Sequence, residues 1–246
     1  MRLLLPPSET KRDGGAEGSA LDLSLLGFPR LTAQRRRMLA AVRVLAQNRS
    51  TMATALKLGH TQLFEVDRNR ALRHSALLPA IDRYTGVLYD ALGADSLSDS
   101  ARAFAIEHVT IQSALFGLLR AGDPVPAYRL SHDSRLPGLP LGAAWRGPIS
   151  RELGEVPGLL LDLRSEAYVA LGPAPLGSWF LRVVTEDADG IRRALNHFNK
   201  KGKGEFTRAI LEAGVDHDSV GSLLDWAASS GIRLARGSGF ELFLTV

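Results

Sequence analysis

The sequence contains no cysteine, and this absence removes several kinds of chemistry at once. A chain without thiols forms no disulfide, offers no thiolate to a metal ion and has no cysteine nucleophile. Any covalent or acid–base chemistry must therefore rest on hydroxyl, amine, imidazole or carboxyl groups.

Long apolar runs are also missing. No stretch approaches the ~20 residues that a membrane-spanning helix needs. The opening residues MRLLLPPSETK hold an apolar segment that is too short for a signal peptide. We therefore expect a cytoplasmic protein that has no membrane partner.

The familiar catalytic and cofactor signatures are absent as well. No G-x-S-x-G surrounds a serine, and no G-x-G-x-x-G follows a predicted strand. The segment GKGEF at 202–206 lacks the first glycine and the Ser/Thr of a Walker A motif. The six histidines lie far apart and form no H-x-x-x-H pair. The sequence therefore supports neither a metal site nor a resident cofactor.

What remains is an ordinary globular composition with uneven charge. The 246 residues are 45% hydrophobic and 23% charged, enough for a sizeable core, and the formal net charge is +4. Residues 30–50 hold six arginines and no acid, and residues 192–208 hold six Lys or Arg and one acid. Such clusters are consistent with an anionic partner.

The hydrophobic pattern predicts an α/β or α+β fold in a single domain over residues 1–246, with no linker. Leu159–Leu163 is a near-continuous apolar run, as in a strand buried on both faces. Further strands are expected at 2–5, 179–187 and 240–246, and helices at 32–47, 205–214 and 218–231. Residues 109–120 read as a strand that runs into a helical turn. A helix over 97–109 is expected to start with a capping box of Ser96 and Asp99.

Two short helices are predicted within residues 50–72, joined at Leu58, Gly59 and His60. A glycine hairpin between helices can point backbone N–H groups at a phosphate. Glycine is also the commonest residue at helix C-termini, so a plain turn is the alternative.

Polar side chains gather where the predicted elements end. The segment HFNKKGKGEFTR at 197–208 reads as a strand end, a basic turn and a helix start, with an anion site at the helix N-terminus near 204–206. Because ligands gather at the carboxyl ends of strands in α/β sheets, we expect these groups to share one cleft. Arginine and lysine in such a cleft grip anions, and tyrosines can stack on bases. The candidate anion-binding residues from this pattern are Ser8, Lys11, Tyr84, Tyr128, Arg129, Arg164, Ser165, His197, Asn199, Lys200 and Lys203.

Two carboxylates among these cations suggest chemistry, since a pure phosphate groove needs none. Glu9 and Asp162 are the candidate acid and base. A structural alternative exists for each group: Arg164 pairs with Asp162 or Glu166, Tyr128 belongs to the core, and the lysines are solvated.

Five segments in order resemble the YaaA family of peroxide-stress proteins, also called DUF328 or UPF0246, and its actinobacterial branch in particular. The segments are LLPPSETK, YTGVLYDAL, SALFGLLRAGDPVPAYRLS, LLLDLRSEAY and HFNKKGKGEFTRAIL, so the match runs from Leu3 to about Leu211. The resemblance implies a cytoplasmic α/β protein with a helix-hairpin-helix-like element, a basic cleft and DNA binding. Carried onto this chain, the element falls at Met52–Leu72 around Gly59. The cleft residues are Lys11, Arg129, Arg164, Lys200, Lys203 and Arg208.

Two departures from the family pattern matter. The enterobacterial branch has a lysine about where Glu9 stands, and the hairpin reads LKLGHTQ without Gly-x-Gly. A chain without thiols also cannot sense peroxide by thiol oxidation, so a stress role must act downstream of sensing.

Three functions follow as hypotheses. The first is a DNA-binding stress protein that contacts the phosphate backbone without reading bases. The second is an enzyme for a small anionic or nucleotide-like substrate in the same cleft, with Glu9 and Asp162 as acid and base. The third is a scaffold whose polar motifs only stabilise the fold.

Overall fold

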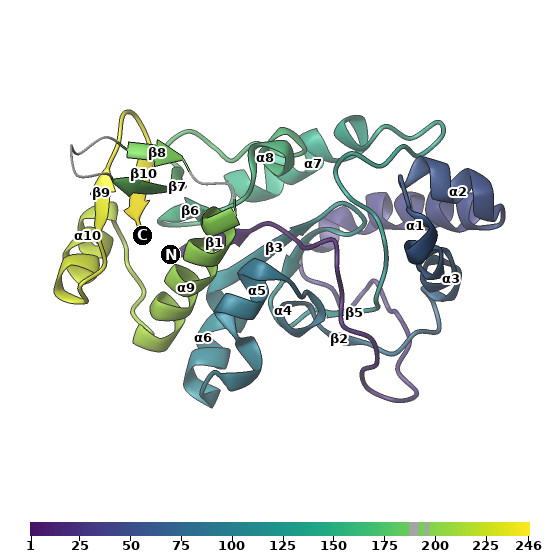
Figure 1. The fold of residues 1–246 in the computed structure, drawn as a ribbon, viewed down its shortest axis with the longest axis horizontal. Helices are drawn as coiled ribbons and strands as arrows, with labels where there is room; N and C mark the ends of the chain where they lie inside the picture. Colours follow the sequence, from purple (N-terminus) through teal and green to yellow (C-terminus); the bar gives the residue numbers. More distant parts are fainter. Residues whose placement is uncertain (187–191, 195–196) are drawn as a thin grey trace.

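The computed structural model describes residues 1–186, 192–194 and 197–246, and it gives their side chains except at 192–194, 197 and 198 (Figure 1). Its centre is a mixed sheet with strand order β4-β3-β1-β6-β7-β10-β9, and β8 pairs with β7. Neighbours from β3 to β10 along this order run parallel, whereas β4, β9 and β8 pair antiparallel with theirs. The predicted α/β fold, a compact unit with a mixed sheet flanked by helices, is confirmed.

The strands of this sheet are short, and a separate two-stranded ribbon joins β2 to β5. Their bounds are β1 Arg2–Leu5, β2 Leu78–Pro79, β3 Val109–Ser113, β4 Gly117–Arg120, β5 Pro124–Val125, β6 Leu160–Asp162, β7 Trp179–Glu186, β8 Arg192–Ala194, β9 Leu234–Arg236 and β10 Glu241–Thr245.

Helices surround the sheet and also form one end of the molecule. Their bounds are α1 Thr32–Ala46, α2 Arg49–Ala55, α3 Phe64–Ala71, α4 Ala80–Arg83, α5 Val87–Leu92, α6 Asp99–His108, α7 Leu141–Gly154, α8 Glu166–Ala170, α9 His197–Ala213 and α10 Val220–Ser229. Figure 1 shows α1, α2 and α3 together at one end, and α10 with β9 at the other. Near the middle, α9 packs against both α5 and α6.

The core is built on the central strands. The three leucines of β1 are fully buried, and β6 beside it is buried along its whole length. Such runs have no polar face because helices cover both sides of a parallel sheet. The expected strands at 2–5 and 159–163 are therefore confirmed.

The segment 109–120 differs from expectation, because it forms the hairpin β3–β4 and no helical turn. Ser113 Oγ accepts the N–H groups of Leu115 (3.1 Å) and Phe116 (3.0 Å), which closes the turn. Gly117 then adopts φ +70°, a left-handed conformation that suits glycine. A short apolar run does not distinguish a strand from a buried helix. Here the hydrogen bonds of Ser113 and the left-handed Gly117 favour a tight turn between two strands.

The start of α6 also differs in detail. Ser98 is the N-cap, since its Oγ accepts the N–H of Ala101 at 3.2 Å. Ser96 instead donates its hydroxyl to the carbonyl of Gly93. The expected capping box of Ser96 and Asp99 is therefore wrong by two residues.

The basic segment 197–208 is helical from its first residue, not a strand end and a turn. Both glycines, Gly202 and Gly204, lie inside α9. A Cβ on Gly202 would stand 3.0 Å from Val183 and Val246, and one on Gly204 would stand 2.2 Å from the carbonyl oxygen of Leu88. The glycines serve close packing of α9 and do not form a turn, so the anion site expected at a helix start near 204–206 is wrong.

The predicted helix pair in residues 50–72 is present as α2 and α3, joined through a short 3₁₀ turn at His60–Gln62. The N–H of Gly59 donates to Gln62 Oε1 at 3.1 Å, and the left-handed residue is Lys57, with φ 55°. The N–H that was expected to face a phosphate is thus occupied by the turn itself. A phosphate contact by this element stays a prediction.

Candidate functional site

A cavity of about 560 Å³ opens where the carboxyl ends of β1 and β6 meet the starts of α5 and α9, and we call it the central pocket. The carboxyl ends of neighbouring parallel strands lie at the same sheet edge, which explains the convergence. Six of the residues expected from the sequence line it: Ser8, Glu9, Ser165, Asn199, Lys200 and Lys203.

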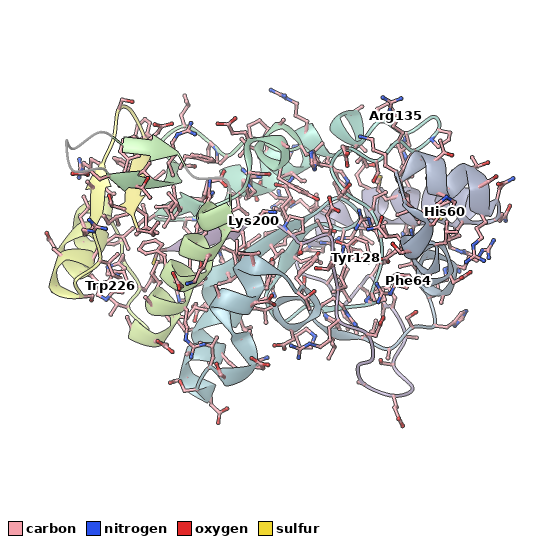
Figure 2. The ribbon with its side chains drawn as sticks, in the orientation of Figure 1. His60, Phe64, Tyr128, Arg135, Lys200 and Trp226 are labelled. Carbon is pink, nitrogen blue, oxygen red and sulfur yellow. The ribbon has the colours of Figure 1, made fainter. Side chains whose placement is uncertain are left out.

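Two lysines of α9 face this pocket from successive turns. Lys203 is 5% exposed, and its Nζ donates to the carbonyl oxygen of Arg164 at 3.3 Å. Burial lowers the pKa of Lys203 to about 8, although the negative charge of Asp162 opposes the shift. Lys200 is exposed at the rim and has no ion-pair partner among the described residues (Figure 2). The spacing of three residues puts both amines on one face of the helix.

Hydroxyl groups form part of the pocket wall. Thr85 Oγ1 donates to Thr10 Oγ1 at 2.9 Å, and Ser8 Oγ lies 3.3 Å from the same atom. Gly86 adopts φ +96°, and a Cβ there would approach Ser8 Oγ to 3.2 Å. This wall offers several neutral hydroxyl groups, and the glycine lets the backbone pass close to them.

Glu9 is the one carboxylate of the pocket wall among the described residues. It pairs through Oε2 with Arg129 Nη2 at 2.6 Å, and Arg129 is itself buried. The backbone of Arg129 is fixed in turn by Asn69 of α3, which accepts its N–H at 2.9 Å and donates to its carbonyl at 2.8 Å. Arg129 therefore orients Glu9 and does not itself line the pocket.

Asp162 and Arg164 lie outside the pocket lining, as a buried pair. Arg164 is fully buried and donates to both carboxylate oxygens of Asp162, from Nε at 2.8 Å and from Nη2 at 2.6 Å. The alternative in which these two residues pair with each other is the one observed. The structure thus does not bring Glu9 and Asp162 together on the pocket wall. Asp162 instead holds Arg164, whose backbone carbonyl accepts the hydrogen bond from the Lys203 amine.

Lys11 points into the protein, away from the pocket. Its Nζ donates to the carbonyl oxygen of Glu9 at 3.0 Å and stands 4.3 Å from the centre of the Tyr128 ring. Burial is the main reason that the pKa of Lys11 falls to about 7, while the nearby charge of Glu65 opposes the shift. The amine stabilises the loop after β1 that carries Glu9.

Tyr84 and Tyr128 are buried too, so neither ring is open to a stacked base. Ser113 Oγ already accepts two backbone N–H groups, so its own proton goes to the Tyr128 hydroxyl at 2.6 Å. Tyr128 then donates to Tyr84 at 2.7 Å. Burial raises the pKa of Tyr128 to about 12, which keeps these hydrogen-bonded hydroxyl groups neutral.

Three other expected residues lie elsewhere. Arg208 donates to the carbonyl oxygens of Leu92 and Gly93 and pairs with Glu212, so it fastens α9 to the end of α5. Gly59 belongs to the distant helical end, beside the labelled His60 in Figure 2. His197 begins α9, but its side chain lies outside the described residues.

The sequence reading missed other pocket residues, above all Thr10 and the pair Ser131–His132. His132 stacks obliquely near Tyr168, with ring centres 5.4 Å apart. Both missed sites belong to segments already singled out, SETK and AYRLSHD, so reading all polar positions of a strand-end loop would have found them.

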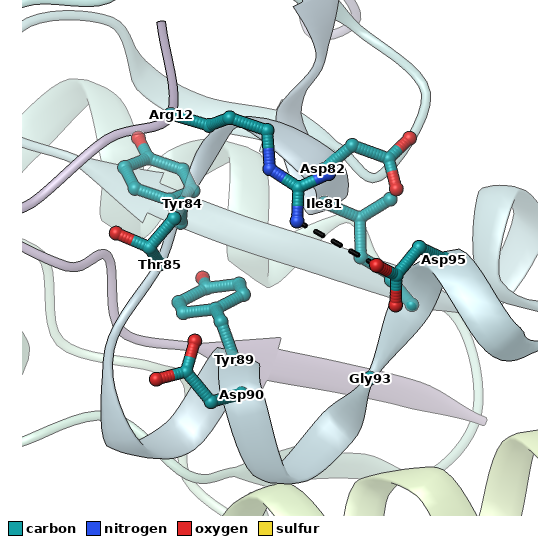
Figure 3. A pocket seen from close by; sticks show the side chains of 10 residues that line it. Arg12, Ile81, Asp82, Tyr84, Thr85, Tyr89, Asp90, Gly93 and Asp95 are labelled. Atoms are coloured by element: carbon teal, nitrogen blue, oxygen red, sulfur yellow. Dashed lines mark ion pairs between the residues drawn. The ribbon is translucent and has the colours of Figure 1, made fainter.

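A smaller cavity of about 160 Å³ lies on the other side of Tyr89 and Thr85, and Figure 3 shows its three aspartates. Asp82 pairs with Arg102 at 2.6 Å, Asp95 with Arg12 at 3.6 Å, and Asp90 accepts the N–H of Gly86. Within the described ranges, no group of three or more His, Asp or Glu side chains is placed to hold a metal ion. Two aspartates of this cavity thus pair with arginines, and the third accepts a backbone hydrogen bond.

Comparisons with known proteins agree with the motifs. A UPF0246 protein of Corynebacterium efficiens is 38% identical over 251 residues, covering 100% of this chain and 99% of that protein. A UPF0246 protein of Streptomyces coelicolor is 38% identical over 231 residues, covering 92% and 88%. One of Caulobacter vibrioides is 33% identical over 151 residues, covering 56% and 58%. The two of these relatives that match over most of their length are actinobacterial, as the resemblance implied.

No helix in the part of the chain that the structure describes is both long and apolar enough to cross a membrane.

The profile of the family described as "Peroxide stress protein YaaA" matches residues 1–231, which include every residue of the central pocket. Together with the relatives that match end to end, this shows that the chain belongs to the YaaA family of peroxide stress proteins.

Proposed function

We propose that the central pocket binds a small anionic ligand, of about nucleotide size, and that this binding is the chain's part in protection from peroxide. The observation that carries the proposal is the buried amine of Lys203, which lines the pocket with no carboxylate at ion-pair distance among the described residues. A charge so placed is costly unless a partner arrives. An anionic ligand is such a partner.

The size and composition of the pocket support a small ligand over a duplex. Its volume of about 560 Å³ is typical of small-molecule sites. Apolar groups such as Pro7, Val87 and Leu163 line it together with the lysines and hydroxyls. Three of the expected phosphate-binding cations, Lys11, Arg129 and Arg164, are turned inward, so little of a basic groove remains at this place.

If the protein is an enzyme, Glu9 is the acid–base group that we assign. Its Oε2 is engaged by Arg129, whereas no partner within the described residues takes its other oxygen. The side chain is 58% exposed, so a ligand can reach it. Asp162 is closed off by Arg164 and supports the site indirectly.

Titration with inorganic phosphate and with adenosine monophosphate, followed by calorimetry, tests the proposal. We expect Lys200→Ala to weaken the binding of both by about tenfold, which is about 1.4 kcal/mol, because a charge-assisted contact is lost. Lys201→Ala is the matched control, since Lys201 pairs with Glu205 outside the pocket at 3.4 Å. Equal losses in both variants would mean that only net charge matters.

The same titration has a predicted pH dependence. A bound anion favours protonated Lys203 and so raises its pKa above the free value of about 8. Above the second phosphate pKa of about 6, where the ligand is a dianion, affinity should therefore be full up to about pH 8 and fall as the pH rises further. In Lys203→Met this fall should be absent; a persistent fall would assign the titration to another group.

DNA-backbone binding is the second candidate, and a different surface favours it. Arg36 and Arg43 are exposed on the outer side of α1 and have no ion-pair partner in the described part of the chain. They lie at the helical end of the molecule, beside α2 and α3 (Figure 1). Arginines free of acids are suited to phosphate contacts. The proposed DNA surface is therefore the α1–α3 end and not the pocket.

Fluorescence titration of a DNA duplex at several salt concentrations tests this second candidate. We expect a linear dependence of log K on log salt, with a slope about two units shallower in Arg36→Ala/Arg43→Ala. Lys200→Ala should leave the slope unchanged. Affinity no better than ~10⁻⁴ M at moderate salt would remove the DNA function, because that is the weak end of nonspecific binding.

A further inference from the structure

The amine of Lys203 stands apart from the other lysines of the chain, of which there are five in all. Lys57 pairs with Asp133 at 2.6 Å and Lys201 with Glu205 at 3.4 Å, both on the surface. Lys200 is exposed, and Lys11 is buried away from any described cavity. Lys203 alone among them combines a buried amine with a place on a pocket wall.

We propose that Lys203 forms an imine with a small aldehyde or ketone that carries an anionic group and is held in the central pocket. This inference rests on the proposed function, because the anionic group is what the pocket is proposed to bind. The carbonyl group of the ligand would then lie against the buried amine.

The surroundings of Lys203 suit a nucleophilic amine. Its only hydrogen bond in the described structure, to the carbonyl oxygen of Arg164, is long at 3.3 Å. The amine also lies over the Phe180 ring, 5.4 Å from its centre, a cation–π geometry that favours the charged form and opposes the effect of burial. Burial nevertheless dominates and lowers the pKa of Lys203 to about 8, so a useful fraction is neutral near neutral pH. Desolvated lysines of this kind are the ones that form imines with carbonyl substrates.

The buried pair behind Lys203 fixes the position of its amine. The backbone carbonyl that accepts from Nζ belongs to Arg164, whose guanidinium is tied to Asp162 and to the carbonyl oxygen of Gly172 at 2.8 Å. This carbonyl is therefore held firmly. The residual negative charge of Asp162 opposes the effect of burial and keeps the pKa of the amine from falling further.

The step balances without an oxidant or reductant. The neutral Nζ adds its lone pair to the carbonyl carbon, and the C=O electrons take up a proton to give a carbinolamine. The nitrogen then loses its second proton, the C–O bond breaks, and the oxygen leaves as water, so amine and carbonyl become imine and water. Glu9, the one carboxylate among the described residues that line the pocket, is the group that we assign to give and take these protons.

The rest of the pocket matches the other half of such a ligand. Lys200 lies one helical turn before Lys203 on the same face and supplies a cation at the rim. Ser8 and Ser165 line the pocket as well, and their hydroxyls would donate to phosphate or carboxylate oxygens of the ligand. A carbonyl compound anchored by its anion would thus place its electrophilic carbon inside the pocket.

The test uses pyridoxal 5′-phosphate, an aldehyde that carries a phosphate, at less than one equivalent and near pH 7.5 (about half a unit below the Lys203 pKa of about 8). Borohydride then reduces any imine to a stable secondary amine, and peptide mapping locates it. The neutral fraction of Lys203 at this pH is roughly two hundredfold that of an ordinary lysine. We expect at least about tenfold more label on Lys203 than on Lys57 or Lys201, the internal controls.

Two variants and one analogue make the result decisive. Lys203→Met should lose the label while Lys201→Gln keeps it, with circular dichroism confirming that both are folded. Pyridoxine 5′-phosphate has the phosphate and lacks the aldehyde, so its binding by calorimetry tests the pocket alone. If it binds but Lys203 is labelled no more than Lys57, the imine is refuted and the proposed anion site stands. If it does not bind and Lys203 is not labelled, both ideas fall.

Discussion

Replacing Arg164 by methionine should destabilise the protein by about 3–5 kcal/mol, because it leaves the Asp162 carboxylate buried and unpaired. Arg164 is fully buried and donates to both oxygens of that carboxylate. It also donates to the carbonyl oxygen of Gly172 at 2.8 Å. Urea unfolding of the variant and of the parent protein measures the difference.

Two further variants distinguish the cost of an unpaired buried carboxylate from the cost of removing any arginine that forms an ion pair. Asp162→Asn/Arg164→Met removes the uncompensated charge and should recover part of the lost stability. Arg49→Met breaks the exposed pair with Asp67, at 3.3 Å, and should cost no more than about 1 kcal/mol. If Arg164→Met and Arg49→Met unfold at the same urea concentration, the buried pair has no special importance.

Gly204→Ala should be the other strongly destabilising change, by about 3 kcal/mol, at the upper end for overpacked sites. The new Cβ would stand 2.2 Å from the carbonyl oxygen of Leu88 and 2.9 Å from Ala91 Cβ, so α9 would have to move away from α5. Thermal unfolding should then occur roughly 10 °C lower. Because α9 carries Lys200 and Lys203, phosphate binding should weaken as well.

The matched control is Gly154→Ala in α7, where an added Cβ meets no atom within 4 Å. This change should stabilise the protein by about 0.5–1 kcal/mol, because alanine restricts the unfolded chain and favours helix. A Gly204→Ala protein as stable as the parent would show that α5 and α9 adjust freely, which contradicts the close packing derived for this pair.

Much of the pocket could be predicted from the sequence, because polar residues that follow an apolar strand mark the sheet edge where ligands bind in α/β folds. Ser8 and Glu9 follow β1, and Ser165 follows β6, as expected. The rule that parallel strand ends converge brought these segments together without any knowledge of the fold. The lysines of α9 were also placed correctly in the pocket, although the segment that carries them was misread as a turn.

The direction in which each charged side chain points could not be read in the same way. Lys11 and Arg129 lie within two residues of pocket-lining positions, yet both turn into the protein. Neighbouring residues of an irregular loop point in different directions, and the choice depends on partners distant in sequence. For Arg129 those partners are Asn69 and Glu9, 60 and 120 residues away.

The sequence by itself determined the family, the α/β class and the central strands, because these follow from motif order and from apolar runs that are local in the chain. Only the tertiary structure decided which cations stay available to a ligand. Burial and pairing of Arg164 with Asp162, and the depth of Lys203 beneath the rim, arise where β6, β7 and α9 meet. The same charge is a solvated group, a structural partner or a reactive amine according to that environment, because desolvation and neighbouring charges set its energy.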